Sequence, residues 1–204
     1  MEKVDFKKDF KVLYKAPERD FVFVEVPPIS YLMIDGAGDP NSVPEFQSAV
    51  ETLYSAAYTI KFMLKKAGIG PEYSVAPLDG LWWCDGNEGF DADNRDKWLW
   101  TMMIPQPRHI GVEMVGSAVS RLTAKGKKGL WDRLGLETLD EGLCVQTLYV
   151  GPYRDEGPTI EAMHRFIHEK GYSLRDKHHE IYLSDPRRSA PEKLKTILRQ
   201  PVSK

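Results

Sequence analysis

Cysteine is scarce in this sequence, and long apolar runs are missing. The 204 residues contain two cysteines, Cys84 and Cys144. They lie far apart and match no CxxC or zinc-binding spacing, which argues against a disulfide framework or a structural metal. No run of about 18 apolar residues, as a membrane helix needs, is present, and the charged N-terminus does not read as a secretory signal. We therefore expect a cytoplasmic protein without a membrane partner.

An excess of charge of one sign is also missing. The chain has 28 Lys and Arg residues against 30 Asp and Glu residues, a formal net charge of −2, and it contains no long basic stretch. Because nucleic-acid-binding surfaces usually appear as clusters of basic residues, we expect no nucleic acid partner. Hydrophobic residues make up 42% and charged residues 28% of the sequence, which is typical of globular proteins and excludes a disordered or fibrous chain.

Motifs for metals and cofactors are incomplete. The turn at 36–38 lacks the third glycine of a dinucleotide-binding fingerprint. The acidic segment 91–96 carries Arg95 where a calcium loop needs an oxygen ligand. His164 and His168 are four residues apart on an expected helix, but the glutamate of an HExxH zinc motif is missing. We therefore expect neither a metal nor an organic cofactor.

The order of elements predicts an α+β fold built by duplication. A strand, a Gly/Pro turn, a helix that ends at glycine and further strand follow one another in both halves. After a polar lead-in, residues 1–19, we expect a single domain, residues 20–204, with pseudo-repeats at about 20–125 and 140–200. One sheet would carry helices on one face and leave the other face for a ligand groove. The expected strands are 20–26, 30–35, 73–83, 98–104, 143–150 and 179–184, and the expected helices include 42–66, 110–124 and 191–198.

Four of the five tryptophans lie between Trp82 and Trp100. Alternate residues of a strand share a face, so Trp98, Trp100 and Met102 lie on one side, whereas Trp82 and Trp83 point to opposite sides. Core packing is the common explanation of an aromatic stripe. A flat aromatic wall also suits a planar apolar ligand or a lipophilic cation, which makes this wall a candidate ligand-binding surface. The pattern leaves open which of Trp82 and Trp83 belongs to it.

Glu180 is the first candidate for chemistry. Strand alternation places Glu180 and Tyr182 on one face and Ile181 and Leu183 on the other. If Ile181 and Leu183 pack on the helices, Glu180 faces the groove. Desolvation among aromatic rings would then raise its pKa toward a value useful for a general acid or base. The plain alternative is an exposed glutamate at a sheet edge.

Glu156 is the second candidate. It stands beside Asp155, just before a further expected helix, which carries Ile160, Met163, Phe166 and Ile167 at helical spacing and ends at Gly171. Acidic residues at this place usually cap a helix N-terminus, and the pattern alone favours that role. Because strand ends and helix starts line the rim of such a sheet, Glu156 could also reach the groove that Glu180 faces.

Four segments of the chain share one resemblance: 77–83 (PLDGLWW), 141–146 (EGLCVQ), 149–153 (YVGPY) and 179–187 (HEIYLSDPR), the last followed by 191–198 (PEKLKTIL). Together they are similar to stand-alone GyrI-like small-molecule-binding proteins. The likeness covers residues 24–201, and this resemblance implies a tandem βαββ fold of the SHS2 type, with antiparallel sheets and a ligand groove between the halves. Relatives that activate transcription carry a helix-turn-helix domain, for which the lead-in has no room, so their DNA-binding role is not expected here.

The resemblance also implies site residues. In the family a groove glutamate on the last strand contacts the ligand, and Glu180 matches it. A subset of the family hydrolyses cyclopropane-bearing genotoxic natural products with a glutamate pair, which Glu156 and Glu180 match. Trp82 or Trp83 matches an aromatic residue of the pocket wall. The expected ligand-binding residues are Trp82, Trp83, Trp98, Trp100, Met102, Tyr149, Tyr153 and Tyr182.

Two main functions and a third alternative follow from these residues and from the resemblance. In the first, the protein captures a hydrophobic, planar or cationic small molecule and hydrolyses strained substrates. Glu180 or Glu156 would act as general base toward water, while the other glutamate or Tyr182 steadies the developing oxyanion. In the second, the protein is a non-catalytic or regulatory binder in which Glu180 only neutralises a ligand cation. A third alternative, a subunit that binds a partner protein through the groove, predicts an open apolar patch.

Overall fold

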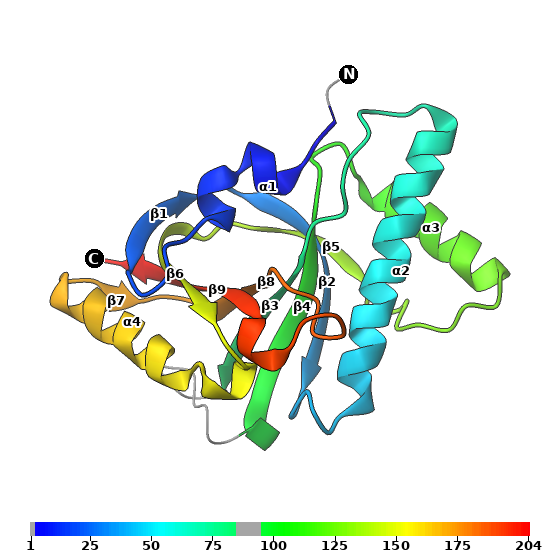
Figure 1. Ribbon diagram of the computed structural model, residues 1–204. Helices are drawn as coiled ribbons and strands as arrows, with labels where there is room; N and C mark the ends of the chain where they lie inside the picture. The colour runs from blue at the N-terminus through cyan, green and yellow to red at the C-terminus, as the bar shows by residue number, and fades with distance from the viewer. Residues whose placement is uncertain (1–2, 85–94) are drawn as a thin grey trace.

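The computed structural model describes residues 3–84 and 95–204. In this part of the chain, nine strands form an antiparallel sheet in the order β1-β6-β9-β8-β3-β4-β2-β5, with β7 paired to β9. The α+β class with a large antiparallel sheet is thereby confirmed (Figure 1). The strands are β1 (Val22–Val26), β2 (Ile29–Ala37), β3 (Leu78–Cys84), β4 (Trp98–Gln106), β5 (Gly135–Leu139), β6 (Gly142–Val150), β7 (Ser173–Leu174), β8 (His178–Tyr182) and β9 (Lys195–Ser203).

The two halves repeat the same order of elements and meet at the centre of the sheet. The first half runs β2, α2 (Pro44–Ala67), β3, β4, and the second runs β6, α4 (Gly157–Glu169), β8, β9. The strands β3 and β8 pair with each other and join the halves. The outer strands are exchanged, because β1 precedes β2 but pairs with β6, and β5 precedes β6 but pairs with β2. This exchange ties each half to the other by backbone hydrogen bonds.

Local backbone conformation and hydrogen bonds define the two ends of the helix α2. At its C-terminus Gly68 adopts a left-handed conformation, with φ 65°, and its N–H bonds to the last carbonyls. At its N-terminus Val43 is the cap residue, and the hydroxyl of the preceding Ser42 donates to the carbonyl of Asp39. Apolar residues at helical spacing, such as Leu53 and Ile60, bury one side of α2 on the sheet. The helix α3 (Val112–Ala124) packs beside α2.

The predicted helix 191–198 is wrong. Residues Pro191–Lys193 form only a 3-10 turn, and β9 begins at Lys195. This strand lies between β6 and β8, and Ile197 and Leu198 are buried on its opposite faces. Buried polar residues such as Arg199 stand beside these apolar residues, so the segment lacks the alternation of apolar and polar residues that would indicate a strand.

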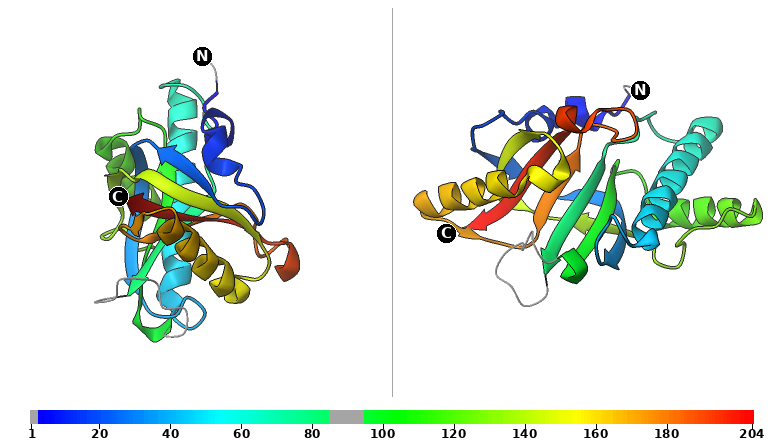
Figure 2. Two further views of the ribbon diagram at one scale, coloured as in Figure 1. Left: turned by 90° about the vertical axis from the view of Figure 1, so that its left-hand side faces the viewer. Right: turned by 60° about the horizontal axis from the view of Figure 1, so that its bottom comes forward.

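The helices α2, α3 and α4 lie on one face of the sheet, called here the helix face. Figure 2 shows α2 and α4 at opposite ends, with the central strands between them. The α4 residues Ile160 and Met163 pack on Leu198 of β9. Glu180 pairs with Leu198 on β9 and with Gly80 on β3, so its side chain projects from this same face. The sequence predicts that Glu180 faces a groove on the side of the sheet without helices, whereas the structure places Glu180 on the helix face.

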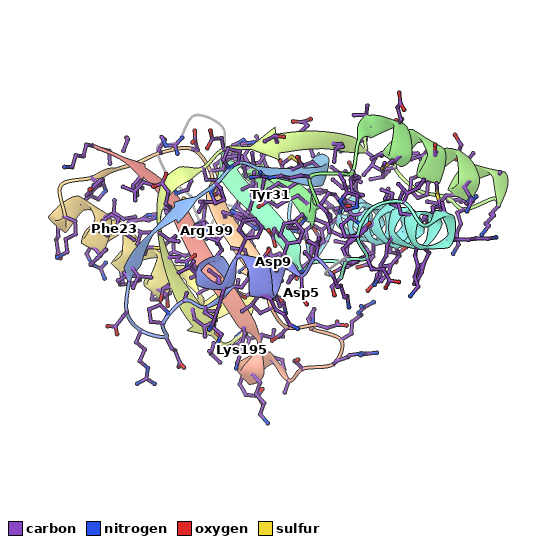
Figure 3. All side chains as sticks on the ribbon, turned by 90° about the horizontal axis from the view of Figure 1, so that it is seen from above. Asp5, Asp9, Phe23, Tyr31, Lys195 and Arg199 are labelled. Carbon is purple, nitrogen blue, oxygen red and sulfur yellow. The ribbon has the colours of Figure 1, made fainter. Side chains whose placement is uncertain are left out.

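Residues 3–19 fill the opposite face, called here the N-terminal face. They form α1 (Phe6–Asp9) and a 3-10 turn, Lys11–Tyr14, whose residues Phe6 and Leu13 are buried against Ile181. Ile181 and Leu183 therefore pack on this segment, while Glu180 and Tyr182 face the helices. Figure 3 looks down on α1 in front of the strands that carry Tyr31 and Arg199.

Two further expectations concern the membrane and the cysteines. Among the described residues, no helix is long and apolar enough to cross a membrane. Cys84 and Cys144 are both buried and unbonded to each other. Most of the loop expected between the tryptophan strands, residues 84–97, lies outside the described residues.

Candidate functional site

Glu156 and Glu180 meet on the helix face. Glu180 lies on β8, at the centre of the sheet, and is 3% exposed, while Glu156 immediately precedes α4 and is 8% exposed. The capping role favoured by the sequence is wrong, because the Glu156 side chain makes no cap hydrogen bond to α4. Its carboxyl group interacts with that of Glu180 instead, and its Oε2 is buried without a hydrogen-bond partner. The structure thus joins the two predicted glutamates into one buried pair.

Burial raises the pKa of both carboxyl groups of the pair. Burial raises the pKa of Glu156, and the charge of Glu180 raises it further. Burial also raises the pKa of Glu180, but hydrogen bonds from Tyr182 and Glu156 stabilise its ionised form and moderate that rise. Two buried carboxyl groups that interact with each other cannot both ionise readily, because their negative charges would repel. The two carboxyl groups therefore hold a single proton between them, because ionisation of one disfavours ionisation of the other.

Tyr182 is oriented toward Glu180 by Trp82. The Nε1–H of Trp82 donates to the Tyr182 hydroxyl oxygen at 3.0 Å, so the Tyr182 hydrogen is available for its bond to Glu180. The two rings meet above Gly80. A Cβ atom at Gly80 would lie 2.9 Å from Trp82 Nε1 and 3.1 Å from the Tyr182 hydroxyl. Glycine is needed here because any side chain would occupy the place of this hydrogen bond.

Trp82, not Trp83, belongs to the aromatic wall. The Trp82 and Trp98 rings pack edge to face, with centroids 5.5 Å apart, and Trp82 is directly opposite Trp100 on β4. Trp83 projects to the N-terminal face. There the ammonium group of Lys177 lies 3.4 Å from the centroid of its ring. The protein's own cation thus covers the Trp83 face.

Trp100 and Met102 lie behind this wall rather than at its surface. Both are fully buried, and Trp100 packs edge to face on Phe46 of α2 at 5.3 Å. A Cβ atom at Gly36 would lie 2.1 Å from the Trp100 ring, so that glycine makes room for the indole. Both side chains therefore support the wall as core residues.

Tyr153 reaches the glutamate pair, whereas Tyr149 shapes the turn before it. The Tyr153 ring packs edge to face on Tyr182 with centroids 5.5 Å apart, and both glutamates act on its hydroxyl. The Tyr149 hydroxyl donates to the carbonyl of Pro152 at 2.9 Å. Tyr149 thereby holds the turn that presents Tyr153 and Glu156.

Sequence reasoning missed two residues of the site. His178 lies two residues before Glu180 on the same strand face, and its Nε2 is 3.7 Å from Glu180 Oε1. Burial lowers the pKa of His178 to about 3, so its imidazole is neutral. Strand alternation was the signal that could have found it. The Arg95 guanidinium lies 5.4 Å from the Trp98 ring centroid and interacts with Glu156, and no motif signalled this role.

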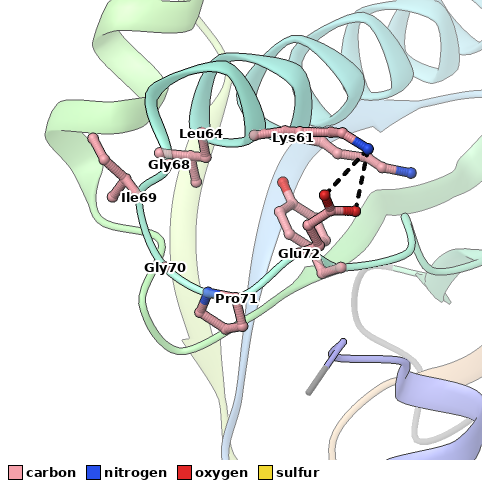
Figure 4. Close-up of a pocket in the computed structure, with 9 residues that line it drawn as sticks. Lys61, Leu64, Gly68, Ile69, Gly70, Pro71 and Glu72 are labelled. Atoms are coloured by element: carbon pink, nitrogen blue, oxygen red, sulfur yellow. Dashed lines mark hydrogen bonds and ion pairs between the residues drawn. The ribbon is translucent and has the colours of Figure 1, made fainter. Parts of the chain in front are cut away.

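Two surface hollows formed by the described residues lie away from this pair. One, of about 120 Å³, is formed by the end of α2 and the loop that follows, where Lys65 Nζ pairs with Glu72 at 3.1 Å (Figure 4). The other, of about 530 Å³, lies between residues 12–17 and β1. The glutamate pair itself is closed by the surrounding side chains. Nor do the described residues contain a group of three or more His, Cys, Asp or Glu side chains that could hold a metal ion.

Comparison with known proteins identifies the family of this chain and structures that share its fold. Residues 19–202 match the model of the GyrI-like small molecule binding domain. A crystal structure of an uncharacterised conserved protein from Listeria innocua has a TM-score of 0.89 and 42% identity, covering 98% of this chain and 100% of that one. A hydrolase from Listeria innocua has a TM-score of 0.84 and 41% identity over 98% of this chain and 100% of its own. None of the curated proteins matches the sequence.

A more distant structure shares the fold alone. The C-terminal domain of EcmrR has a TM-score of 0.55 and 12% identity, covering 91% of this chain and 98% of that domain.

Proposed function

Because the chain belongs to the family of GyrI-like small-molecule-binding domains, we propose that it binds a hydrophobic, planar or cationic small molecule and hydrolyses strained, cyclopropane-containing compounds. The observation that carries this proposal is the buried Glu156–Glu180 pair, in which one carboxyl group holds a proton and the other accepts it. An acid and a base side by side supply both proton transfers of a hydrolysis. The identity of about two fifths to a Listeria innocua hydrolase supports a hydrolytic activity.

The reaction is an addition of water across a ring bond. Glu180 removes a proton from water as the water oxygen bonds to a cyclopropane carbon that is conjugated to a carbonyl group. The ring C–C bond breaks, and its electron pair moves to the carbonyl oxygen through the conjugated system. Glu156 protonates this enolate, and the hydroxyl group of Tyr153, on which both glutamates act, would donate a hydrogen bond to it. The proton that Glu180 gained then returns to Glu156 along their hydrogen bond, which restores the pair.

The pair also suits an alternative function, binding of a cation without turnover. An ionised Glu180 beside the rings of Trp82 and Tyr153 combines charge attraction with cation–π contacts, which recognise lipophilic cations. In a cell, either function would lower the free concentration of a toxic compound. Only the hydrolase would change it chemically.

Product analysis by mass spectrometry, with a cyclopropane-bearing alkylating compound, tests the proposal. We expect Glu180→Gln to lower turnover by about 10²–10⁴-fold, the usual contribution of a general base, with binding retained. Glu156→Gln should also lower turnover, because it cannot protonate the enolate. Glu161→Gln is the matched control, since Glu161 lies on α4 with its side chain 75% exposed. Turnover unchanged in both site variants would remove the pair from the mechanism, and tight binding without turnover in the wild type would favour the alternative function.

A further inference from the structure

Arg95 lies at the edge of the glutamate site, on a 3-10 turn, Arg95–Lys97, that leads into β4. The carbon at the centre of its guanidinium is 5.4 Å from the centroid of Trp98, the geometry of a cation–π contact. The same guanidinium attracts Glu156. Trp98 in turn packs edge to face on Trp82. One cationic side chain thus contacts the aromatic wall and acts on the carboxyl pair.

The two faces of the sheet differ in how they neutralise a buried carboxylate. On the N-terminal face Glu141 contacts two cations, since His179 Nδ1 lies 2.9 Å from Glu141 Oε1 and Arg199 Nη1 lies 3.5 Å from Oε2. On the helix face, His178 beside Glu180 is neutral. Among the charged side chains that the structure describes, Arg95 attracts Glu156 from this face, and His179 acts on Glu180 from across the sheet.

We propose that Arg95 is a resident cation, which occupies the position that the positive group of a cationic ligand takes. This inference rests on the proposed small-molecule binding at the Glu156–Glu180 pair. A lipophilic cation would replace Arg95 on the Trp98 ring and would take over its attraction to the Glu156 carboxyl group, because one cation satisfies both interactions and two would repel each other. Arg95 is only half-buried, so it can move into water at little cost. A neutral ligand gains nothing from this exchange. Arg95 therefore competes with cationic ligands only, and a cation must bind tightly enough to displace it.

Calorimetric titration with a matched pair of planar ligands tests this role. The probes are N-methylquinolinium, a permanent cation, and quinoline, which is neutral at slightly alkaline pH. We expect Arg95→Met to bind N-methylquinolinium about three- to tenfold more tightly than the wild type, the equivalent of one partly exposed cation–π contact. The affinity for quinoline should stay unchanged. Arg154→Met is the control, because Arg154 is 76% exposed and pairs with Asp155 at 3.7 Å, away from the aromatic wall.

Each outcome separates this inference from the proposed hydrolysis. Equal or weaker binding of the cation by Arg95→Met, equal tightening for both ligands, or no cation binding by either protein would overturn the role of Arg95. Cyclopropane hydrolysis by the wild type would stand in each of these cases. Conversely, tighter cation binding by Arg95→Met in a protein that hydrolyses nothing would support Arg95 and reject the hydrolase.

Discussion

His178 and His179 are consecutive residues of β8, yet their surroundings move the pKa values of their imidazoles in opposite directions. Burial lowers the pKa of His178 to about 3. Burial would also lower that of His179, but Glu141 and Asp79 outweigh it and raise the pKa to about 8. Burial is likewise outweighed at Glu141, whose pKa His179 and Arg199 lower to about 2. Strand alternation thus puts an ion-paired network on one face and a neutral histidine beside Glu180 on the other.

The first prediction concerns the pH dependence that His179 imposes. Its folded pKa, about 8, lies above the unfolded value of about 6.5, so its stabilising contribution is complete below about pH 6.5. That contribution is lost as the pH rises through about 8. We expect the free energy of unfolding, measured with urea, to fall across this window. Nuclear magnetic resonance should show His179 titrating there while His178 stays neutral.

The variant His179→Gln provides the comparison for this prediction. It removes the titrating group, so it should flatten the fall in stability between about pH 6.5 and about 8.5. An equally steep fall in His179→Gln would assign the effect to other groups and contradict the prediction.

The second prediction is that Glu156→Gln stabilises the protein. Burial raises the pKa of Glu156 far above its unfolded value, so the folded state binds a proton that the unfolded state releases above about pH 4.5. Folding at neutral pH therefore includes the cost of protonating Glu156. Glutamine needs no proton, and we expect a gain of about 1 kcal/mol or more at neutral pH that shrinks toward about pH 4.5.

Urea denaturation at acidic and neutral pH measures this gain. The control Glu161→Gln should change stability by less than about 0.5 kcal/mol at either pH, because exposed substitutions on a helix surface have little effect. A Glu156→Gln protein that is less stable than the wild type at neutral pH would show that Glu156 stabilises the fold as an ion. It would then not be the acid of the pair.

Local signals made part of this structure predictable. Helical spacing and Gly68 gave the position of α2 to within about two residues, the usual uncertainty of helix ends. Strand alternation correctly put Glu180 and Tyr182 on one face, since the side-chain period of a strand is fixed. The expected pairing of the tryptophan strands was confirmed too, because Trp82 and Trp100 are cross-strand neighbours.

The remaining features depend on contacts between distant segments. The face that Glu180 would share with the helices could not be read from alternation, which is silent on whether residues 3–19 return to cover the other face. The direction of the Glu156 side chain depends on Glu180, which follows 24 positions later in the sequence. Similarly, Arg95 reaches Trp98 through the local path of a turn rather than through any periodic pattern. Sequence patterns describe faces and periods, but not which faces meet.

The third prediction concerns the network that holds residues 3–19 on the sheet. Arg199 Nη2 donates to the carbonyl of Leu13 at 2.9 Å, and its other nitrogens contact Glu141 and Gln146. We expect Arg199→Met to cost about 3–5 kcal/mol, because it leaves Glu141 buried with less compensation and frees a carbonyl group. Arg187→Met is the control, since the Arg187 side chain is 81% exposed.

Urea denaturation and limited proteolysis together test this prediction. If the network anchors the N-terminal segment, Arg199→Met should be cleaved within residues 3–19 before the rest of the chain is attacked. A loss of stability without faster cleavage there would contradict the anchoring role, and so would a cost no larger than that of Arg187→Met.

The fourth prediction is that Gly80→Ala impairs the site more than its single methyl group suggests. The new Cβ would lie 2.9 Å from Trp82 Nε1, 3.1 Å from the Tyr182 hydroxyl and 3.2 Å from Met102 Cε. At least one of these groups must shift, which breaks the bond that orients Tyr182 toward Glu180. We expect a destabilisation of about 1–3 kcal/mol, as for other overpacked cores, together with a loss of turnover or ligand binding and a change in tryptophan fluorescence.

Gly116→Ala in α3 is the matched control, because nothing lies within 4 Å of its Cβ position, and it should stabilise the helix by about 0.5–1 kcal/mol. Full ligand binding and turnover in Gly80→Ala would mean that the contact of Trp82 with Tyr182 does not position Glu180.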